Sequence, residues 1–160
     1  MHGVLYMNLF DFLITHQNIA AKASVKNWEE AVRKGGELLI NSFACTPAYV
    51  EGIIETCRAN NAAFVIAPGI AMPHTRPEKG AKATGFALVT LETPVNFGDP
   101  ENDPVDLLFF MVGKDENAHV GDAMVQIGDL CDNAEDLKRL RACRTVQEII
   151  SFLRAVKNKY

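Results

Sequence analysis

Apolar runs of strand length alternate along this chain with stretches of helical periodicity, and this alternation constrains the fold more than any other feature. Helices are predicted to begin near Asn27, Thr46, 115–119 and Thr145. Strands are predicted over 64–67, 84–92, 94–98 and 105–112, with the first of them buried. Because helices and strands are interleaved, the sequence predicts a layered α/β fold with a largely buried mixed β-sheet between helices.

The starts of the predicted helices carry recognisable capping residues. Asn27 followed by Glu30, and Thr145 followed by Glu148, have the spacing of a capping box. Thr46-Pro47 supplies an N-cap residue and a proline for the first helical position.

The length of the chain suits one domain with a sizeable core. We expect residues 1–160 to form a single domain, with residues 1–17 as an N-terminal extension packed on it. The apolar stretch 4–14 is too short to span a bilayer and is interrupted by Asn8 and Asp11. The four cysteines are widely spaced and include no C-x-x-C pair, which indicates reduced thiols in a cytoplasmic protein.

Charge and motif spacing argue against two classes of function. The formal net charge of −4 gives no support to a nucleic-acid-binding protein, which normally carries a basic patch. No H-E-x-x-H motif occurs and no cysteine lies near His74 or His119, so a metal site is not predicted.

A histidine between two prolines is the strongest functional signal. His74 lies between Pro73 and Pro77, directly after an apolar run, and each proline stiffens the backbone before it. A rigid loop after a strand can present a reactive group at the edge of a sheet, and imidazole can serve as a nucleophile, a base or a ligand near pH 7.

Three further residues complete the candidate site. His119 lies where a helix is predicted to begin, so unpaired N–H groups and the helix dipole favour an anion there. If the strand 105–112 lies beside the strand leading to His74, both histidines end at neighbouring strand termini. Arg76 and Arg58 are candidate anion clamps, because guanidinium groups match phosphate oxygens. For Arg58, a simple favourable charge at a helix C-terminus is an equally good explanation.

Three segments in order resemble one protein family. GIAMPHTRPEKGA, VNFGDPENDPVDLLFFM and DENAHVG are similar to segments of enzyme IIA of the bacterial phosphoenolpyruvate:sugar phosphotransferase system (PTS). The resemblance is to the mannitol/fructose class, most closely its ascorbate-type branch. It runs from about Asn18 to the C-terminus and implies a three-layer α/β sandwich with a mixed sheet.

The resemblance also implies a chemistry without metal or cofactor. His74 corresponds to the histidine that accepts a phosphoryl group from the carrier protein HPr and passes it to a cysteine of enzyme IIB, and His119 to the supporting histidine. Arg58 has the separation from the active histidine that an arginine has in mannitol-type members. Residues 70–72 would form an apolar collar around the histidine, or would serve only to pack the loop.

The resemblance implies the partner proteins, and the residues leave alternative functions open. HPr and enzyme IIB are the expected partners, the membrane component enzyme IIC is an indirect one, and a homo-oligomer is compatible with the sequence. A regulatory module similar to nitrogen-branch enzyme IIA proteins would use His74 in the same way, and a metal-dependent hydrolase using His74 and His119 is a third hypothesis.

Overall fold

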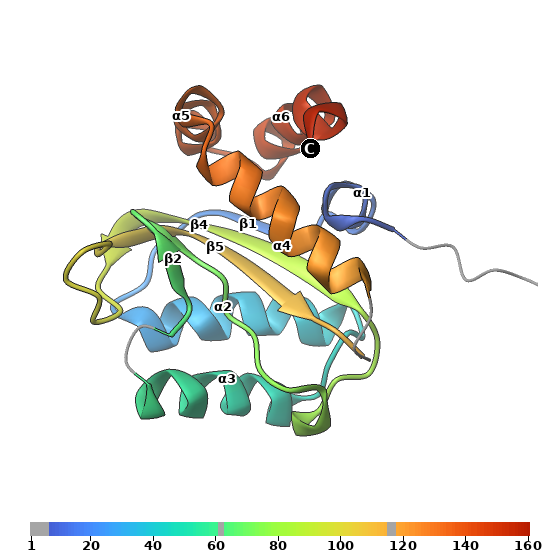
Figure 1. Ribbon diagram of the computed structural model, residues 1–160, viewed down its shortest axis with the longest axis vertical. Helices are drawn as coiled ribbons and strands as arrows, with labels where there is room; N and C mark the ends of the chain where they lie inside the picture. Colours follow the sequence, from blue (N-terminus) through green and yellow to red (C-terminus); the bar gives the residue numbers. More distant parts are fainter. Residues whose placement is uncertain (1–6, 61–62, 115–117) are drawn as a thin grey trace, which may run out of the picture.

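A mixed β-sheet with helices on both faces forms the framework of the protein (Figure 1). The computed structural model describes residues 7–60, 63–114 and 118–160, apart from the side chains of Ala118 and His119. Over these residues the strands are β1 (Ile19–Ala23), β2 (Val65–Ala67), β3 (Ile70–Ala71), β4 (Gly85–Val95) and β5 (Val105–Val112). The α-helices are α1 (Leu9–His16), α2 (Trp28–Asn41), α3 (Pro47–Ala59), α4 (Ala118–Cys131), α5 (Ala134–Ala142) and α6 (Val146–Val156), with 3₁₀ turns η1 (Pro77–Lys79) and η2 (Lys157–Lys159).

The order of the strands across the sheet is β1-β4-β5-β3-β2. β1 runs parallel to β4 and β3 runs parallel to β5, whereas β4–β5 and β2–β3 are antiparallel. Helices α2 and α3 lie on one face, and α1, α4, α5 and α6 lie on the other (Figure 1). The predicted three-layer α/β sandwich with a mixed sheet is therefore confirmed.

The predicted strands agree with the structure in part. The strand 105–112 has the predicted bounds, and the strand at 84–92 is present as β4. A separate strand at 94–98 is wrong, because β4 continues through a register shift until Val95 pairs with Val105. The strand predicted at 64–67 is β2, but it lies at the edge of the sheet and Ile66 is 43% exposed, so its expected burial is wrong.

The capping residues explain where three helices begin. The Asn27 side chain accepts from the amide of Glu30 at 2.9 Å, and Thr145 and Glu148 form a reciprocal capping box. Thr46 occupies the N-cap of α3, but its hydroxyl makes no capping bond and is buried without a partner among the described residues. Pro47 at the first helical position is the predicted start signal of α3 that the structure retains.

The described part of the N-terminal extension contributes a helix to the core. Residues 1–6 of the expected extension lie outside the described residues, but α1 begins after Asn8, whose side chain caps it through the amide of Asp11. Leu9, Phe10 and Leu13 on this helix are fully buried. The sequence did not predict this helix, nor β1, β3 and α5.

Two apolar clusters fill the space between the layers. One lies between the sheet and α1, α4, α5 and α6, and the other lies between the sheet and α2 and α3. Alternate residues of β5 serve the two clusters, with Phe109 in the first and Phe110 in the second. Helix α2 approaches β5 closely because Gly35 faces the Phe110 ring, which lies 2.1 Å from where a Cβ atom at Gly35 would be. This contact explains why a glycine is placed inside a helix, where its intrinsic propensity is low.

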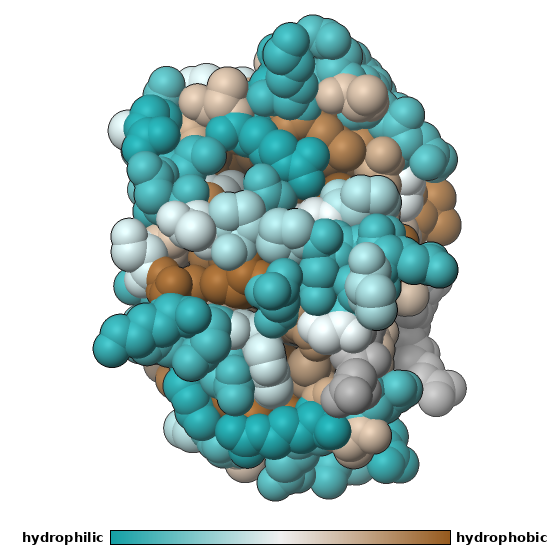
Figure 2. Space-filling view, turned by 90° about the vertical axis from the view of Figure 1, so that its left-hand side faces the viewer, coloured by the Kyte–Doolittle hydropathy of each residue, from teal (hydrophilic) through white to brown (hydrophobic). Residues whose placement is uncertain are grey.

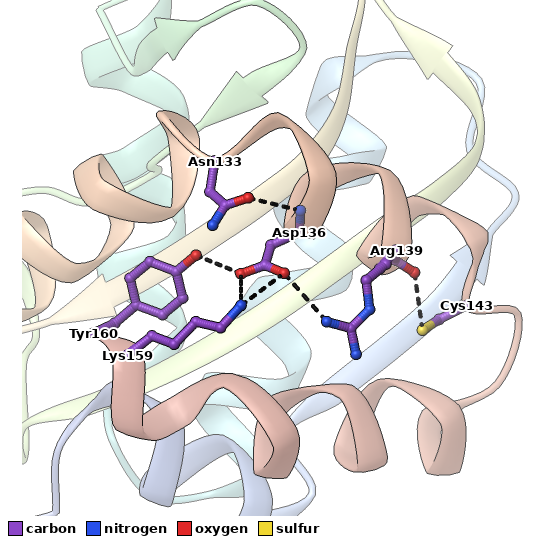
Figure 3. A network of polar contacts seen from close by, with 6 residues as sticks. All are labelled: Asn133, Asp136, Arg139, Cys143, Lys159 and Tyr160. Atoms are coloured by element: carbon purple, nitrogen blue, oxygen red, sulfur yellow. Dashed lines mark hydrogen bonds and ion pairs between the residues drawn. The ribbon is translucent and has the colours of Figure 1, made fainter.

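A buried carboxylate anchors the end of the chain to α5 (Figure 3). Asp136 accepts hydrogen bonds from Tyr160 at 2.6 Å, from Lys159 at 3.0 Å and from Arg139 at 3.2 Å. The Tyr160 ring also stacks on Phe10 of α1, with ring centroids 5.9 Å apart. The C-terminal residues thereby join α5 and α1 in one layer.

The outer surface on one side of the molecule is mainly hydrophilic. Figure 2 shows this side, on which hydrophobic residues appear only in smaller areas between hydrophilic ones. Over the described ranges, no helix has the length and apolar character needed to cross a membrane.

Candidate functional site

His74 follows β3 at the carboxyl end of the strand. The amide of Met111 on β5 donates to the carbonyl of Pro73 at 3.3 Å, so the pairing of β3 with β5 extends up to the histidine. The imidazole is half-buried and its ring lies 5.5 Å from the Phe64 ring, centroid to centroid. The rigid loop predicted before His74 is therefore in part a strand.

One ring nitrogen of His74 is occupied by a backbone contact. Nδ1 lies 2.6 Å from the carbonyl oxygen of Met72. Because a carbonyl oxygen can only accept, Nδ1 carries the proton in this contact, and the lone pair of the neutral ring resides on Nε2. The contact thus selects the tautomer in which Nε2 is the nucleophile or base.

The residue after His74 is tied to α3. The Tyr49 hydroxyl lies 3.1 Å from the amide nitrogen of Thr75 and 2.9 Å from the carbonyl oxygen of Met111. The hydroxyls of Thr75 and Thr56 are 3.2 Å apart. Burial raises the pKa of the Tyr49 phenol to about 12, so this group stays neutral near pH 7. Tyr49 and Thr56 therefore connect the segment that carries His74 to α3.

These α3 residues are functional candidates that the sequence analysis missed. Tyr49 lies four residues before Ile53, on the same face of the helix, and this spacing was the available signal. The spacing places Tyr49 in the core, but it does not reveal that the hydroxyl reaches the histidine segment.

The start of α4 lies at the same edge of the sheet as His74. β3 and β5 are parallel neighbours, so their carboxyl ends meet at one edge, and α4 is the next element after β5. His119 is the second residue of α4, and its side chain lies outside the described residues. The chain segment that leads to His74 does lie beside β5, but the strand that pairs with β5 is β3 and not the predicted strand at 64–67.

The two arginines of the candidate site are on the surface. The Arg76 side chain is 79% exposed and contacts Glu78 at 3.8 Å. Arg58 lies in the last turn of α3, and its guanidinium pairs with Glu29 of α2 at 3.7 Å. A direct role of either arginine at His74 stays a prediction.

The proposed apolar collar is part of the core. Ile70 and Ala71 are fully buried and Met72 is 3% exposed. Ile70 and Met72 contribute to one apolar cluster and Ala71 to the other. The alternative of simple packing therefore accounts for these residues, which fix the strand before His74 in place.

Among the described residues, no group of three or more histidine, cysteine or acidic side chains is arranged to hold a metal ion. What the described geometry provides is a single imidazole whose Nδ1 is anchored by a backbone carbonyl and whose Nε2 has no partner among the described residues. Such a group can form and release a covalent bond to an incoming electrophile.

Comparison with known proteins gives a consistent result. Residues 12–156 match the family described as "Phosphoenolpyruvate-dependent sugar phosphotransferase system, EIIA 2". An ascorbate-specific PTS system EIIA component from Shigella flexneri is 42% identical over 147 residues, which cover 92% of this chain and 96% of the relative. The crystal structure of a PTS IIA protein (PtxA) from Streptococcus mutans superimposes with a TM-score of 0.84 and 32% identity, covering 95% of this chain and 96% of that one.

Two more distant structures share the fold. The complex of the mannitol enzymes IIA and phosphorylated IIB from Escherichia coli matches with a TM-score of 0.73 at 22% identity, over 87% of this chain and 95% of that one. The nitrogen regulatory protein IIA-Ntr from Neisseria meningitidis matches with a TM-score of 0.67 at 22% identity, over 86% and 94%. The nitrogen regulatory protein is thus a distant neighbour, whereas the ascorbate-specific relative is 42% identical over most of the chain, so sugar transport is the better supported function. The chain belongs to the EIIA 2 family of the phosphoenolpyruvate-dependent sugar phosphotransferase system and is a phosphotransferase component of that system.

Proposed function

We propose that Nε2 of His74 accepts a phosphoryl group from the phosphohistidine of HPr and passes it to a cysteine of enzyme IIB. In the first step the P–N bond of the donor breaks as the bond from phosphorus to Nε2 forms. In the second step the P–Nε2 bond breaks as the cysteine sulfur takes the phosphoryl group. The contact between Nδ1 and the Met72 carbonyl carries this proposal, because it leaves Nε2 as the nucleophile throughout.

The other predicted residues have supporting roles in this relay. His119 would donate a hydrogen bond to the transferred oxygens, and the first turn of α4 would add backbone N–H groups. Arg76, with an exposed guanidinium, would neutralise the phosphoryl charge, and Arg58 would assist it. The transfer needs positioning and charge stabilisation, and it needs neither a metal nor a cofactor.

The names of the relatives support a physiological setting for this relay. The name of the Shigella flexneri relative specifies ascorbate, so we propose uptake of ascorbate or a related sugar through enzyme IIC. The mannitol complex contains enzyme IIB, which supports enzyme IIB as the acceptor here. We propose that residues 1–160 act as one cytoplasmic domain, alone or as a homo-oligomer.

Phosphorylation with purified components tests this function. The protein, incubated with phosphoenolpyruvate, enzyme I and HPr, should gain an acid-labile phosphoryl group whose ³¹P NMR signal is that of Nε2-phosphohistidine. His74→Ala should abolish the gain, whereas His16→Ala, which changes an exposed histidine on α1, should not. An active donor system that leaves the wild-type chain unmodified would refute the proposal.

Transfer to enzyme IIB separates transport from regulation. A phosphorylated chain that loses its phosphoryl group to the cysteine of a cognate ascorbate-type enzyme IIB acts in transport. A chain that is labelled on His74 but never delivers the group to such an enzyme IIB acts as a regulator.

A further inference from the structure

The pairing of β3 with β5 has a register that includes His74. The two residues of β3 pair with Leu107 and Leu108 of β5. Continuing this register along both chains places His74 opposite Met111. In a parallel pair with this register, the Met111 amide donates to the carbonyl oxygen of the residue before His74. The Met111 carbonyl oxygen accepts from the amide of the residue after His74.

Only the first of these bonds is direct. The Met111 amide donates to Pro73 at 3.3 Å. The second bond would join the Thr75 amide to the Met111 carbonyl, and the Tyr49 hydroxyl occupies that position instead. The Thr75 amide donates to the hydroxyl oxygen at 3.1 Å, and the hydroxyl reaches the Met111 carbonyl at 2.9 Å.

The single proton of the hydroxyl decides its role. The Thr75 carbonyl oxygen is also near, at 3.2 Å, but the Met111 carbonyl oxygen is closer at 2.9 Å. The hydroxyl of Tyr49 therefore donates to Met111 and accepts from Thr75. It is inserted into the ladder and separates the chain from β5 at the residue after His74.

We propose that Tyr49 is a positioning residue for His74. The Tyr49 hydroxyl acts as a fixed spacer between β5 and the segment that carries His74, and it thereby sets the direction of Nε2. This inference rests on the proposed function, in which Nε2 carries the phosphoryl group. Tyr49 is fully buried on α3, so the spacer has little freedom to move. Without the hydroxyl, the Thr75 amide either bonds directly to Met111 or loses its partner, and the histidine backbone shifts in both cases.

A second tether keeps the segment attached when the spacer is removed. The Thr56 hydroxyl donates its proton to the carbonyl of Gly52 at 2.8 Å. The Thr75 hydroxyl is consequently the donor in its 3.2 Å contact with Thr56. Tyr49→Phe leaves this tether and the aromatic packing in place, so the variant is expected to fold.

Transfer kinetics of Tyr49→Phe test the inference, with Tyr160→Phe as the matched control. Tyr160→Phe loses a hydroxyl that bonds to Asp136 (Figure 3), and it lies at the apolar cluster on the opposite face of the sheet from Tyr49. With phospho-HPr as donor, Tyr49→Phe should lower kcat for phosphoryl uptake about 10- to 100-fold and leave KM for the donor unchanged, since misplacement of a reacting atom slows the chemical step. Tyr160→Phe should keep the wild-type kcat, with both variants assayed where urea titration shows them folded.

The possible results separate the two proposals. A wild-type chain that is loaded, together with a Tyr49→Phe chain of unchanged kcat, overturns the spacer role. A raised KM with unchanged kcat also overturns it, because the residue would then act in donor binding. A wild-type chain that is never loaded refutes the phosphocarrier function instead.

NMR spectra test the spacer role of Tyr49 without an activity measurement. In Tyr49→Phe the imidazole signals of His74 and the amide signal of Thr75 should shift, whereas Tyr160→Phe should leave both unchanged. Signals that stay at their wild-type positions in Tyr49→Phe would overturn the spacer role whether or not the chain carries a phosphoryl group.

Discussion

At the scale of single residues, the protein combines reactive and inert groups by controlling their surroundings. His74 is held through Nδ1 by a backbone carbonyl, which leaves one nitrogen for chemistry. The thiol of Cys45 is buried, and burial raises its pKa to about 11, so it is protonated near pH 7. Burial of Cys131 has the same effect and raises the pKa of that thiol to about 11. The chain therefore offers its nucleophilic imidazole without competing thiolates at these positions.

His119→Ala should retain loading of His74 but slow delivery to enzyme IIB. The proposed role of His119 is to stabilise the oxygens of the transferred group, and loss of one such donor typically costs about 100-fold in rate. Rapid-quench measurement of transfer from the phosphorylated chain to enzyme IIB gives this rate. Complete loss of loading from phospho-HPr would contradict the prediction and assign His119 an essential part in the first step.

Asp136→Asn should destabilise the protein in a pH-dependent way. The hydrogen bond from Tyr160, assisted by Lys159 and Arg139, lowers the pKa of the Asp136 carboxyl below its ordinary value. A lowered folded-state pKa contributes stability that is present above the unfolded pKa of about 4 and is lost as the pH falls through the folded pKa. Urea titrations should show a loss of about 1–3 kcal/mol near pH 7.

The same titrations at about pH 3 and below should show a smaller difference between Asp136→Asn and the wild type. Glu135→Gln is the matched control, because Glu135 lies one residue earlier on α5 and is exposed. A difference for Asp136→Asn that is constant over this pH range would contradict the assigned ionisation.

At the scale of elements, sequence patterns were informative where a segment carries its own signal. The stretch 105–112 is apolar on both faces and became β5 with the predicted bounds, and α6 begins at its capping box. Helix α5 is polar over most of its surface, so its apolar periodicity was too weak to detect. Strand β3 has two residues and is defined by its pairing with β5 and β2, which no local pattern encodes.

The same distinction applies to the site. The prolines around His74 marked the loop in the sequence, and the place of His119 near a helix start was correct. The Tyr49 hydroxyl could not be found in this way, since its contacts are with Thr75 and Met111, which are distant along the chain. Contacts of this kind are determined by how the layers stack.

A pair of glycine substitutions tests the contact between α2 and the sheet. Gly35→Ala places a methyl group against the Phe110 ring and should destabilise the protein by about 1–3 kcal/mol, despite the higher helix propensity of alanine. Gly128→Ala on α4 is the control, because a Cβ there meets nothing within 4 Å, and it should stabilise by up to about 1 kcal/mol. Thermal and urea unfolding measure both values, and a stabilising Gly35→Ala would contradict the close packing.

At the scale of the whole molecule, the two apolar clusters share one sheet. Each of the central strands β4 and β5 contributes residues to both clusters. Loss of either helical layer would therefore expose one face of the same strands to water. This arrangement favours unfolding of both layers together.

Unfolding followed by two probes should give one transition. Trp28, the one tryptophan of the chain, packs beside Phe97 in the layer of α2 and α3, with ring centroids 5.9 Å apart. Its fluorescence reports on that layer, whereas far-UV circular dichroism reports on helices of both layers. The two urea transitions should coincide in midpoint and slope. A fluorescence change that precedes the loss of helix would show that the layers unfold separately, against a single cooperative domain.

The backbone contact of the His74 ring restricts how the donor and the acceptor protein can reach the histidine. Nδ1 contacts the carbonyl of Met72, so in the proposed relay Nε2 is the one atom that both accepts and releases the phosphoryl group. Donor and acceptor must then approach that atom from one direction and cannot be bound in productive contact at the same moment. The rate of phosphoryl delivery to a transporter would consequently depend on how fast HPr and enzyme IIB dissociate from this chain. An excess of HPr or of enzyme IIB would inhibit the transfer.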